Sequence, residues 1–274
     1  MPELPEVETV RRSLEPQVLE QTILEADVYY GGIIKAPDPH TFCDRIKGRR
    51  VKSVLRRGKY LIFTLDLSTM LVIHLRMTGQ LLVCGREAPL KKHTHLVFRL
   101  SGGQELRFID IRKFGLVYLV ENNDMSAVKG LHTLGPEPLA EDFTWGGLAE
   151  KLKKRRGALK AFLLDQSQIA GIGNIYADEI LFQAGLHPER KPQDLKPQEV
   201  KNLYAAIRFK LQEGIDFRGT SIRDYIDAKG EKGSFQNRLQ VYDRAGRPCM
   251  RCGQILKKKV IAGRGSVYCP NCQT

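Results

Sequence analysis

Residues 94–108 read THLVFRLSGGQELRF, and this stretch decides the architecture of the first half of the chain. Leu96, Phe98 and Leu100 fall on one face of an extended chain, because side chains alternate between the two faces of a strand. The alternation resumes after Ser101-Gly-Gly-Gln104, a sequence typical of a tight hairpin turn. The stretch therefore predicts two antiparallel strands that share one apolar face.

The flanking residues extend the strand pattern to a whole domain. Short apolar runs bounded by turns recur between residues 22 and 120, for example at 60–65, 70–75 and 114–120. Several short strands separated by turns indicate an antiparallel sandwich or barrel. A helix is expected ahead of them, because Pro5 suits a first helical turn and apolar residues follow at helical spacing. These apolar residues are Val7, Val10, Leu14 and Val18.

The second half of the chain changes from strands to helices. The proline-rich sequence LGPEPL at 134–139 is typical of a joint between domains. Helices are expected at 148–156, 158–165, 174–184 and 197–214. Residues 218–236 lack apolar periodicity and are expected to form a mobile loop. The predicted organisation is an α+β multidomain fold with a β-sandwich domain at 1–134, a linker at 135–145, a helical domain at 146–236 and a terminal module at 237–274.

The chain carries a large positive charge that is concentrated near its C-terminus. Its 274 residues include 44 Lys+Arg and 31 Asp+Glu, which gives a formal charge of +13. Within residues 237–274 the basic side chains are opposed by a single acid, Asp243, so the local charge is +7. A basic module of this kind suggests nucleic acid as the partner. An acidic membrane surface is the second choice, and a basic face kept for solubility is the plain alternative.

The composition also indicates the class of protein and its cellular location. A hydrophobic fraction of 42% and a charged fraction of 27% are typical of a folded globular protein. No stretch reaches the ~18 consecutive apolar residues that a membrane helix needs, and the first residues do not resemble a signal peptide. We therefore expect a cytoplasmic protein that has no membrane segment.

Four of the six cysteines lie in the terminal module. Cys249, Cys252, Cys269 and Cys272 form the pattern C-x2-C-x16-C-x2-C, in which two knuckles offer four thiolates to one tetrahedral zinc. Two disulfides are the alternative, but a chain in a reducing compartment is not expected to form them. Because a closed four-cysteine site has no open position for a substrate, we predict one structural zinc ion per chain.

The first residues offer a nucleophile and an acid. Removal of Met1 would expose Pro2 as a secondary amine, and a terminal amine is deprotonated at pH 7 far more often than a lysine. Such an amine can attack an electrophilic carbon and form an iminium. Glu3 is its neighbour, and both precede a helix whose positive end favours a carboxylate. The plain alternative is that Pro2 and Pro5 only begin the helix.

Further segments could contact a polyanion. The sequence IAGIGN at 169–174 offers two glycines for tight turns and Asn174 as a helix N-cap, an arrangement that can bind phosphate. The sequences HLRM at 74–77 and DIRKF at 110–114 place arginine, aromatic and methionine side chains on loops. Such side chains could enter a duplex and replace an extruded base. The alternatives are an ordinary turn at the first segment, and core packing or ion pairing at the other two.

Taken together, these segments closely resemble bacterial formamidopyrimidine-DNA glycosylases. The resemblance follows the whole chain and rests on motifs in the same order: MPELPEVETV at 1–10, RRGKYL at 56–61, HLRMTG at 74–79, DIRKFG at 110–115, LGPEPL at 134–139, AGIGNIYADE at 170–179, and AGRG at 262–265 within the paired CxxC knuckles. It implies an N-terminal antiparallel β-sandwich with an N-terminal helix, a helix-two-turn-helix domain and a C-terminal zinc β-hairpin. Asp243 and Ser266 depart from the Gly and Thr that are usual in the family.

The resemblance also implies an activity in base excision repair, with no organic cofactor. The family removes oxidised purines, above all 8-oxoguanine opposite cytosine and formamidopyrimidines, and then cleaves the strand at the abasic site. Pro2 would be the nucleophile at the sugar C1′, and Glu3 would protonate the opening sugar. Lys59 would donate a proton in β-elimination and Arg264 in δ-elimination.

The resemblance likewise implies which residues contact double-stranded DNA. Arg112 would contact the orphaned cytosine, while Met77 and Phe114 would fill the gap in the base stack. The remaining DNA contacts would come from His74, His93, Arg155, Lys160 and Asn174. The lesion-recognition loop would lie within 218–236.

Two alternatives to this activity remain. An enzyme of the endonuclease VIII type prefers oxidised pyrimidines, but Met77 together with Arg112 and Phe114 favours the purine branch. A non-catalytic zinc-ribbon DNA-binding protein is less favoured, because Pro2, Glu3 and Lys59 are all present. On this interpretation the protein is a monomer of the bacterial cytoplasm that associates with the nucleoid.

Overall fold

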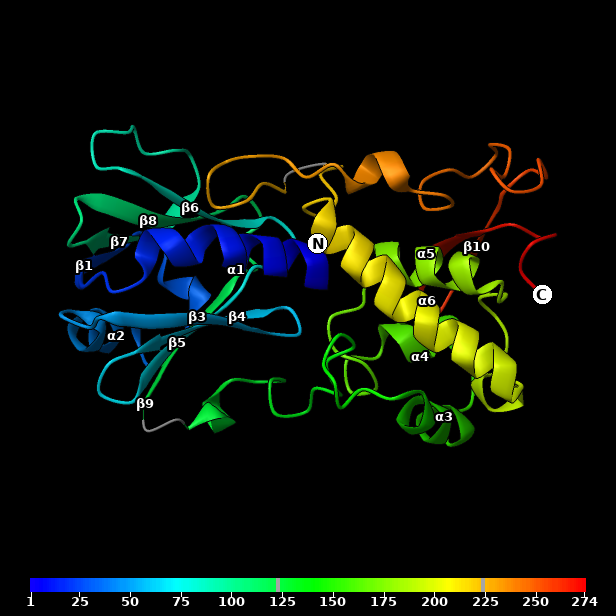
Figure 1. The fold of residues 1–274 in the computed structure, drawn as a ribbon. Coiled ribbons are helices and arrows are strands. Elements are labelled where there is room, and N and C mark those ends of the chain that lie inside the picture. Colours follow the sequence, from blue (N-terminus) through cyan, green and yellow to red (C-terminus); the bar gives the residue numbers. More distant parts are fainter. Residues whose placement is uncertain (122–123, 223–224) are drawn as a thin grey trace. The chain divides into compact units, whose positions relative to one another are not determined.

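The computed structural model describes residues 1–121, 124–222 and 225–274, which divide into two compact units (Figure 1). Unit 1 comprises Met1–His132 together with Phe217–Ser234. Unit 2 comprises Thr133–Asp216 together with Phe235–Thr274. The chain therefore leaves unit 1, builds most of unit 2, and returns to unit 1 before it finishes unit 2. The predicted helical domain at 146–236 included residues 217–234, which the structure groups with unit 1.

Unit 1 is built around two β-sheets. One has four strands in the order β1-β7-β8-β6, and the other has five strands in the order β2-β9-β5-β4-β3. Antiparallel pairing prevails, as predicted, but the short edge strand β2 lies parallel to β9. The strands of the two sheets are β1 (Ile23–Val28), β2 (Ile34–Ala36), β3 (Val51–Arg57), β4 (Tyr60–Leu65), β5 (Thr69–His74), β6 (Gly79–Gly85), β7 (Thr94–Leu100), β8 (Gln104–Asp110) and β9 (Leu116–Glu121).

The stretch 94–108 forms the hairpin that its sequence predicts. Leu96 pairs with Phe108 and Phe98 pairs with Leu106 across β7 and β8. These four side chains are at most 3% exposed and belong to one core cluster with residues of both sheets. The apolar face of the hairpin is thus the inner face of a β-sandwich.

Two helices accompany the sandwich. Helix α1 (Leu4–Val18) buries its apolar stripe in the same cluster, as its 3.6-residue period predicts. Helix α2 (Pro39–Ile46) was not predicted, because only Phe42 and Ile46 of its eight residues are buried apolar side chains. It begins at Asp38, whose carboxylate accepts from two main-chain N–H groups of the first turn.

Unit 2 contains the helices α3 (Trp145–Lys153), α4 (Leu159–Leu164), α5 (Asn174–Ala184) and α6 (Pro197–Asp216), and a hairpin of β10 (Lys257–Ile261) and β11 (Arg264–Tyr268). Helix α3 starts three residues earlier than predicted, because the hydroxyl of Thr144 accepts from Gly147 N at 3.1 Å and caps the helix there. Short 3-10 turns lie at Gly31–Ile33, Met125–Ala127, Pro192–Asp194 and Phe235–Arg238. Among the described residues, no helix is long and apolar enough to cross a membrane.

The loop at 217–234 differs from the expectation of a mobile segment, and Asp243 has an uncommon backbone conformation. The described part of the loop at 217–234 is not loose, because Thr220, Tyr225 and Ala228 each hydrogen-bond to helix α1. Residues 223–224 of the expected mobile loop lie outside the described residues. Asp243 adopts a φ of 58°, a backbone conformation that glycine enters most easily and Asp better than most residues.

Candidate functional site

The start of helix α1 holds the predicted nucleophile and acid. Pro2 and Glu3 are buried, whereas Met1 is 50% exposed. Glu3 is the N-cap residue of α1 and forms a capping box with Glu6, in which each carboxylate accepts from the other residue's main-chain N–H. The Glu6 carboxylate lies 2.9 Å from Glu3 N. The two predicted catalytic residues are therefore held on an ordered backbone at the positive end of the helix.

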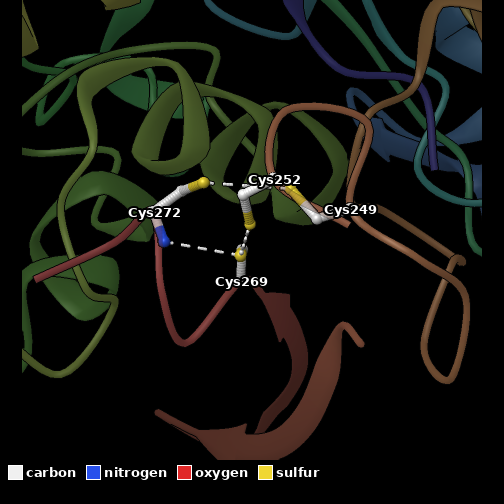
Figure 2. A group of neighbouring side chains, drawn as sticks. All are labelled: Cys249, Cys252, Cys269 and Cys272. Atoms are coloured by element: carbon white, nitrogen blue, oxygen red, sulfur yellow. Dashed lines mark hydrogen bonds between the residues drawn. The ribbon is translucent and has the colours of Figure 1, made fainter. Parts of the chain in front are cut away.

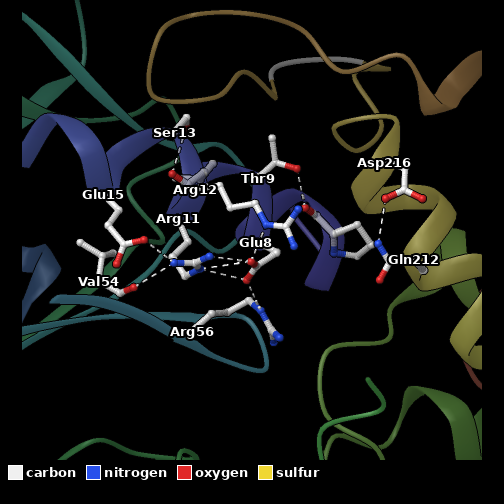
Figure 3. Close-up of polar contacts among 12 residues, drawn as sticks. Glu8, Thr9, Arg11, Arg12, Ser13, Glu15, Val54, Arg56, Gln212 and Asp216 are labelled. Carbon is white, nitrogen blue, oxygen red and sulfur yellow. Dashed lines mark hydrogen bonds and ion pairs between the residues drawn. The ribbon is translucent and has the colours of Figure 1, made fainter. Parts of the chain in front are cut away.

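A cluster of charges around the buried Glu8 on α1 continues to strand β3 of the sandwich (Figure 3). The Glu8 carboxylate forms ion pairs with Arg11, Arg12 and Arg56 at 2.9, 2.8 and 3.1 Å. Burial acts to raise the pKa of Glu8, but the hydrogen bonds from Arg11 and Arg12 and the nearby charges hold it below its usual value. Arg56 in turn donates to the carbonyl of Gly58 at 3.1 Å, so this cluster fixes the turn that follows β3.

Lys59 lies in that turn, between β3 and β4. Gly58 precedes it with a φ of 56°, which suits the first central position of a two-residue hairpin loop. Although Lys59 is at a hairpin tip, it is only 6% exposed. The turn thus presents a lysine whose surroundings are largely closed to solvent.

His74 ends strand β5 and is a neutral donor rather than a cation. Arg76 N donates to its Nδ1 at 2.9 Å, so the ring proton of the neutral imidazole is carried on Nε2. Burial, reinforced by the charges of Arg76 and Lys59, lowers the pKa of His74 to about 3. His74 therefore offers an N–H that does not depend on pH in the physiological range.

The two predicted stack-filling side chains, Met77 and Phe114, lie at the surface of unit 1 together with Arg112, the predicted contact of the orphaned cytosine. Met77 is 42% exposed and Phe114 is 48% exposed, which excludes the alternative that they belong to the sandwich core. The guanidinium of Arg112 contacts both: its Nη1 lies 3.0 Å from Met77 Sδ, and its Cζ lies 4.6 Å from the centre of the Phe114 ring. An arginine, an aromatic ring and a thioether thus project as one group.

A buried aspartate holds this group in place. Asp110 is 0% exposed, and its carboxylate accepts from the Thr78 hydroxyl at 2.5 Å, from Arg112 N at 3.2 Å and from Gly115 N at 2.8 Å. Its main-chain N–H donates to the carbonyl of His93 at 3.0 Å. His93 is half-buried with a φ of 67°, so the same aspartate also ties the predicted DNA contact at residue 93 to this loop.

In unit 2, Lys160 has a different position from the one expected. It is 0% exposed, and its ammonium donates to Asp178 at 2.6 Å, to the Ser266 hydroxyl at 2.7 Å and to the Gly265 carbonyl at 3.2 Å. Asp178 also accepts from Val267 N at 3.0 Å, and burial raises its pKa to about 6 against the opposing charge of Lys160. The expectation that Lys160 contacts DNA does not fit this burial, because its charge is used inside unit 2. It fastens the β10–β11 hairpin to helices α4 and α5.

Asn174 begins helix α5, but Gly173 rather than Asn174 is its N-cap residue. The side chain of Asn174 instead donates to the Gly265 carbonyl at 3.1 Å, so it contacts the hairpin and cannot reach back to cap its own helix. Its Oδ1 is buried and has no hydrogen-bond partner in the described structure. Arg155, the other predicted contact in this unit, forms an ion pair with Asp165 at 2.7 Å and is half-buried.

The four cysteines of unit 2 converge as predicted (Figure 2). Their sulfur atoms all lie within 4.8 Å of one another, with Cys249 to Cys272 at 3.9 Å and Cys252 to Cys269 at 3.5 Å. A tetrahedron of sulfurs about 2.3 Å from a central zinc has edges of about 3.8 Å, so the four thiolates fit this ion. None of the four forms a disulfide. The site accommodates one structural zinc.

Arg264 lies at the tip of the hairpin that these cysteines support. Ala262 and Gly263 form the tight turn with φ values of 52° and 69°, and Arg264 begins β11 opposite Ile261. Two successive positive φ values are those of the turn that best matches the twist of a hairpin. The Arg264 side chain is exposed, as an anion-binding residue must be.

Sequence analysis did not predict the contacts that Glu6, Glu8 and Asp110 make. One signal was present: an acid three residues after Glu3 has the spacing of a capping box. Arg56 at Glu8 and Thr78 at Asp110 come from distant parts of the sequence, so no local spacing could identify these two contacts.

Comparison with known families and structures agrees with this geometry. The chain matches the family models for the formamidopyrimidine-DNA glycosylase N-terminal domain at residues 1–117, the formamidopyrimidine-DNA glycosylase H2TH domain at 134–226, and the zinc finger found in FPG and IleRS at 246–274. It is 47% identical to the formamidopyrimidine-DNA glycosylase of Pelotomaculum thermopropionicum, covering 100% of this chain and 99% of that protein. It is 52% identical to that of Moorella thermoacetica, covering 94% of each.

Solved structures of the Lactococcus lactis protein are also similar. One is a variant in complex with DNA that contains Fapy-dG, with a TM-score of 0.93, 38% identity and 100% of both chains covered. Another is a complex with DNA that contains an abasic site, with a TM-score of 0.93, 38% identity and 99% of both chains covered. A third, with a TM-score of 0.92, 38% identity and 100% of both chains covered, contains an oxidised pyrimidine in the DNA.

Proposed function

Because this chain belongs to the formamidopyrimidine-DNA glycosylase family, and so is a DNA glycosylase of base excision repair, we propose that it excises oxidised purines and then cleaves the strand at the resulting abasic site. The observation that carries the proposal is the placement of Pro2 beside Glu3, both buried, with Glu3 held by the capping box of α1. The Lactococcus lactis complexes with Fapy-dG and with an abasic site support the two substrates.

The proposed reaction begins at the sugar C1′. Once Met1 is removed, the Pro2 nitrogen attacks C1′ with its lone pair, the bond from C1′ to the base breaks, and the base leaves with the bonding electrons and takes up a proton. Glu3 protonates the ring oxygen as the sugar opens, which leaves an iminium between C1′ and Pro2. Loss of a C2′ proton then expels the 3′ phosphate, and a second elimination expels the 5′ phosphate.

Lys59 and Arg264 are proposed to assist these eliminations. Lys59 supplies an ammonium from a turn that is only 6% exposed, where its hydrogen bonds to a departing phosphate are strong. Arg264 is exposed at a hairpin tip, and a guanidinium does not give up its proton in proteins. We therefore assign to Arg264 the clamping of a phosphate by a bidentate contact rather than the donation of a proton.

The grip on DNA is proposed to come from three groups of residues. Met77 and Phe114 fill the gap left by the extruded nucleotide and Arg112 contacts the orphaned cytosine, which agrees with their joint exposure. His74 and His93 contact the backbone from unit 1, and Arg155 and Asn174 do so from unit 2. The zinc, when bound by its four cysteines, fixes the loop ends that support the hairpin.

A trapping experiment tests the proposal. Mature protein is incubated with duplexes that carry 8-oxoguanine opposite cytosine, or thymine glycol, and sodium borohydride is added to reduce the iminium to a stable adduct. We expect an adduct on the 8-oxoguanine duplex that is lost in Pro2→Gly and in Glu3→Gln. Glu150→Gln, which removes the charge of an exposed carboxylate on α3, is the matched control and should retain the adduct.

The other outcomes identify the rival functions. An adduct confined to the thymine glycol duplex would support an oxidised-pyrimidine glycosylase, a possibility favoured by the Lactococcus lactis complex with an oxidised pyrimidine. Tight binding of both duplexes without any adduct would identify a non-catalytic DNA-binding protein. We further propose that the protein acts as a monomer in the bacterial cytoplasm, where it meets its substrate at the nucleoid.

A further inference from the structure

The Glu6 carboxylate connects two segments that are far apart in the sequence. One oxygen accepts from Glu3 N at 2.9 Å, and the other accepts from Thr220 N at 2.7 Å. Glu6 is 2% exposed, so water does not compete effectively for either bond. A single buried side chain therefore holds the backbone of the proposed acid and the backbone of the loop at 217–234.

The loop backbone is packed directly against Glu6. Gly219 has a φ of 77°, and a Cβ on it would lie 2.8 Å from Glu6 Cγ and 2.9 Å from Glu6 Oε1. On the other side, a Cβ on Gly233 would lie 2.2 Å from the Gly219 carbonyl oxygen. The segment around Gly219 is thus confined between Glu6 and Gly233, and neither glycine has room for a side chain.

More bonds seat the same loop along α1. The Tyr225 hydroxyl donates to the main-chain carbonyl of Glu6 at 3.2 Å, and Ala228 N donates to the Ser13 hydroxyl at 3.1 Å. The Ala228 carbonyl accepts from Val83 N in β6 at 3.1 Å. The loop is consequently fixed at both ends of its contact with α1, and Glu6 is its point of contact with the first turn.

We propose that Glu6 is a positioning residue that couples the loop at 217–234 to the Pro2–Glu3 pair. A displacement of Gly219 and Thr220 must move the carboxylate that also holds Glu3 N, because both bonds share one rigid carboxylate group. The loop therefore sets the geometry of the chemistry. This inference rests on the proposed function of Pro2 and Glu3.

The test uses DNA that has no base for the loop to contact. Strand cleavage of a preformed abasic-site duplex is measured under single-turnover conditions with saturating protein, and the dissociation constant for a reduced abasic duplex is measured in parallel. Gly219→Ala is expected to slow cleavage about tenfold or more, as the loss of one well-placed hydrogen bond to a reacting group would, while the dissociation constant changes less than twofold.

Gly103→Ala is the matched control. Gly103 lies in the hairpin turn of unit 1 at a φ of 80°, with nothing within 4 Å of the added Cβ, so this variant carries the same backbone strain without touching Glu6. It should cleave abasic DNA at the wild-type rate. If Gly219→Ala also cleaves at that rate, the coupling is wrong, even when base excision by the same variant is impaired.

Glu6→Gln provides a second route that keeps the side-chain shape. An amide has one oxygen, so it can accept from Thr220 N or Glu3 N but not from both. The variant is expected to slow abasic-site cleavage by a similar factor, and Gly219→Ala is expected to add little in the Glu6→Gln background. Multiplicative effects in the double variant would overturn the coupling. Absence of any borohydride-trapped adduct in the wild-type protein would instead overturn the proposed function.

Discussion

Single residues in this protein act largely by holding backbone in place. The residues of chemical interest, Pro2, Glu3, Arg112 and Phe114, could be proposed from the sequence because their motifs are local and resemble those of a family. The residues that position them could not be found in this way. Asp110 is one aspartate among many in the sequence, and only the fold brings Thr78 to its carboxylate.

Asp110→Asn is expected to loosen the loop that carries Arg112 and Phe114. Its carboxylate accepts from a hydroxyl and from two main-chain N–H groups, and an amide NH2 at one of these positions would face a donor. We expect a loss of about 1–3 kcal/mol in the free energy of unfolding and weaker binding of lesion duplex. Urea unfolding and fluorescence titration measure the two effects. Asp44→Asn, at a carboxylate that is 68% exposed, should leave both unchanged.

Protonation of His74 in the unfolded chain lowers the free energy of unfolding at acid pH. Its pKa in the folded protein is about 3, against an ordinary value of 6.5, because burial disfavours the charged ring. Between these pH values the unfolded chain binds a proton that the folded chain does not. Stability is therefore unaffected by His74 above pH 6.5 and declines by about 1.4 kcal/mol per pH unit from this group as the pH falls below it.

The measurement is NMR of the histidine ring nitrogens. We expect the His74 signals to keep the shifts of a neutral ring protonated on Nε2 from pH 8 to pH 5. A His74 transition near pH 6.5 would contradict the burial argument. The same neutral state means that a His74 contact to phosphate contributes a hydrogen bond and no net charge.

At the scale of elements, the sequence predicted whether a segment is a helix or a strand better than it predicted where the element begins and ends. The hairpin at 94–108 and helix α1 were predictable because their apolar faces follow one period over many residues. Helix α2 has too few buried residues to show a period, and α3 starts at a cap that lies outside its apolar pattern. The seating of the loop at 217–234 on α1 depends on main-chain N–H groups of the loop that donate to side chains of α1, and the side chains of the loop itself show no pattern that predicts these bonds.

Removal of zinc is expected to unfold the end of unit 2 and to abolish DNA binding. Four cysteine sulfurs within 4.8 Å of one another repel as thiolates unless a cation binds them. The two cysteine knuckles are therefore not expected to stay folded without the metal. Metal analysis should give one zinc per chain. After treatment with a strong chelator, Arg264 loses its fixed turn and affinity for duplex falls.

Cysteine variants separate this effect from general thiol chemistry. Cys252→Ser should lose zinc and DNA binding, whereas Cys84→Ser, at a thiol in β6 outside the cluster, should keep both. The Lys160–Asp178 pair, which joins α4 to α5 without using the metal, is expected to remain in the chelated protein. Undiminished affinity in metal-free protein would contradict the proposed role of the site.

At the scale of the whole molecule, the charge of +13 predicts binding that weakens steeply with salt. Each phosphate contact releases a condensed counterion, so the number of contacts can be obtained from the slope of log affinity against log salt concentration. Arg264→Gln, at the proposed phosphate clamp, is expected to reduce this slope by about 1, equally on lesion and undamaged duplexes. Lys52→Gln, whose ammonium pairs with Glu20, is the control and should leave the slope unchanged.

Because unit 1 consists of two separate segments of the chain, the ribosome completes it late in synthesis. Its sheets and α1 are complete once His132 has been made, but the segment that seats on Glu6 ends only at Ser234. At ~5–20 residues per second, synthesis of the intervening hundred or so residues takes roughly 5–20 s. During that interval the Glu6 carboxylate of the nascent sandwich lacks its hydrogen bond from Thr220 N, and water takes the place of this donor. The first residues to be synthesised are thus among the last to acquire their native contacts.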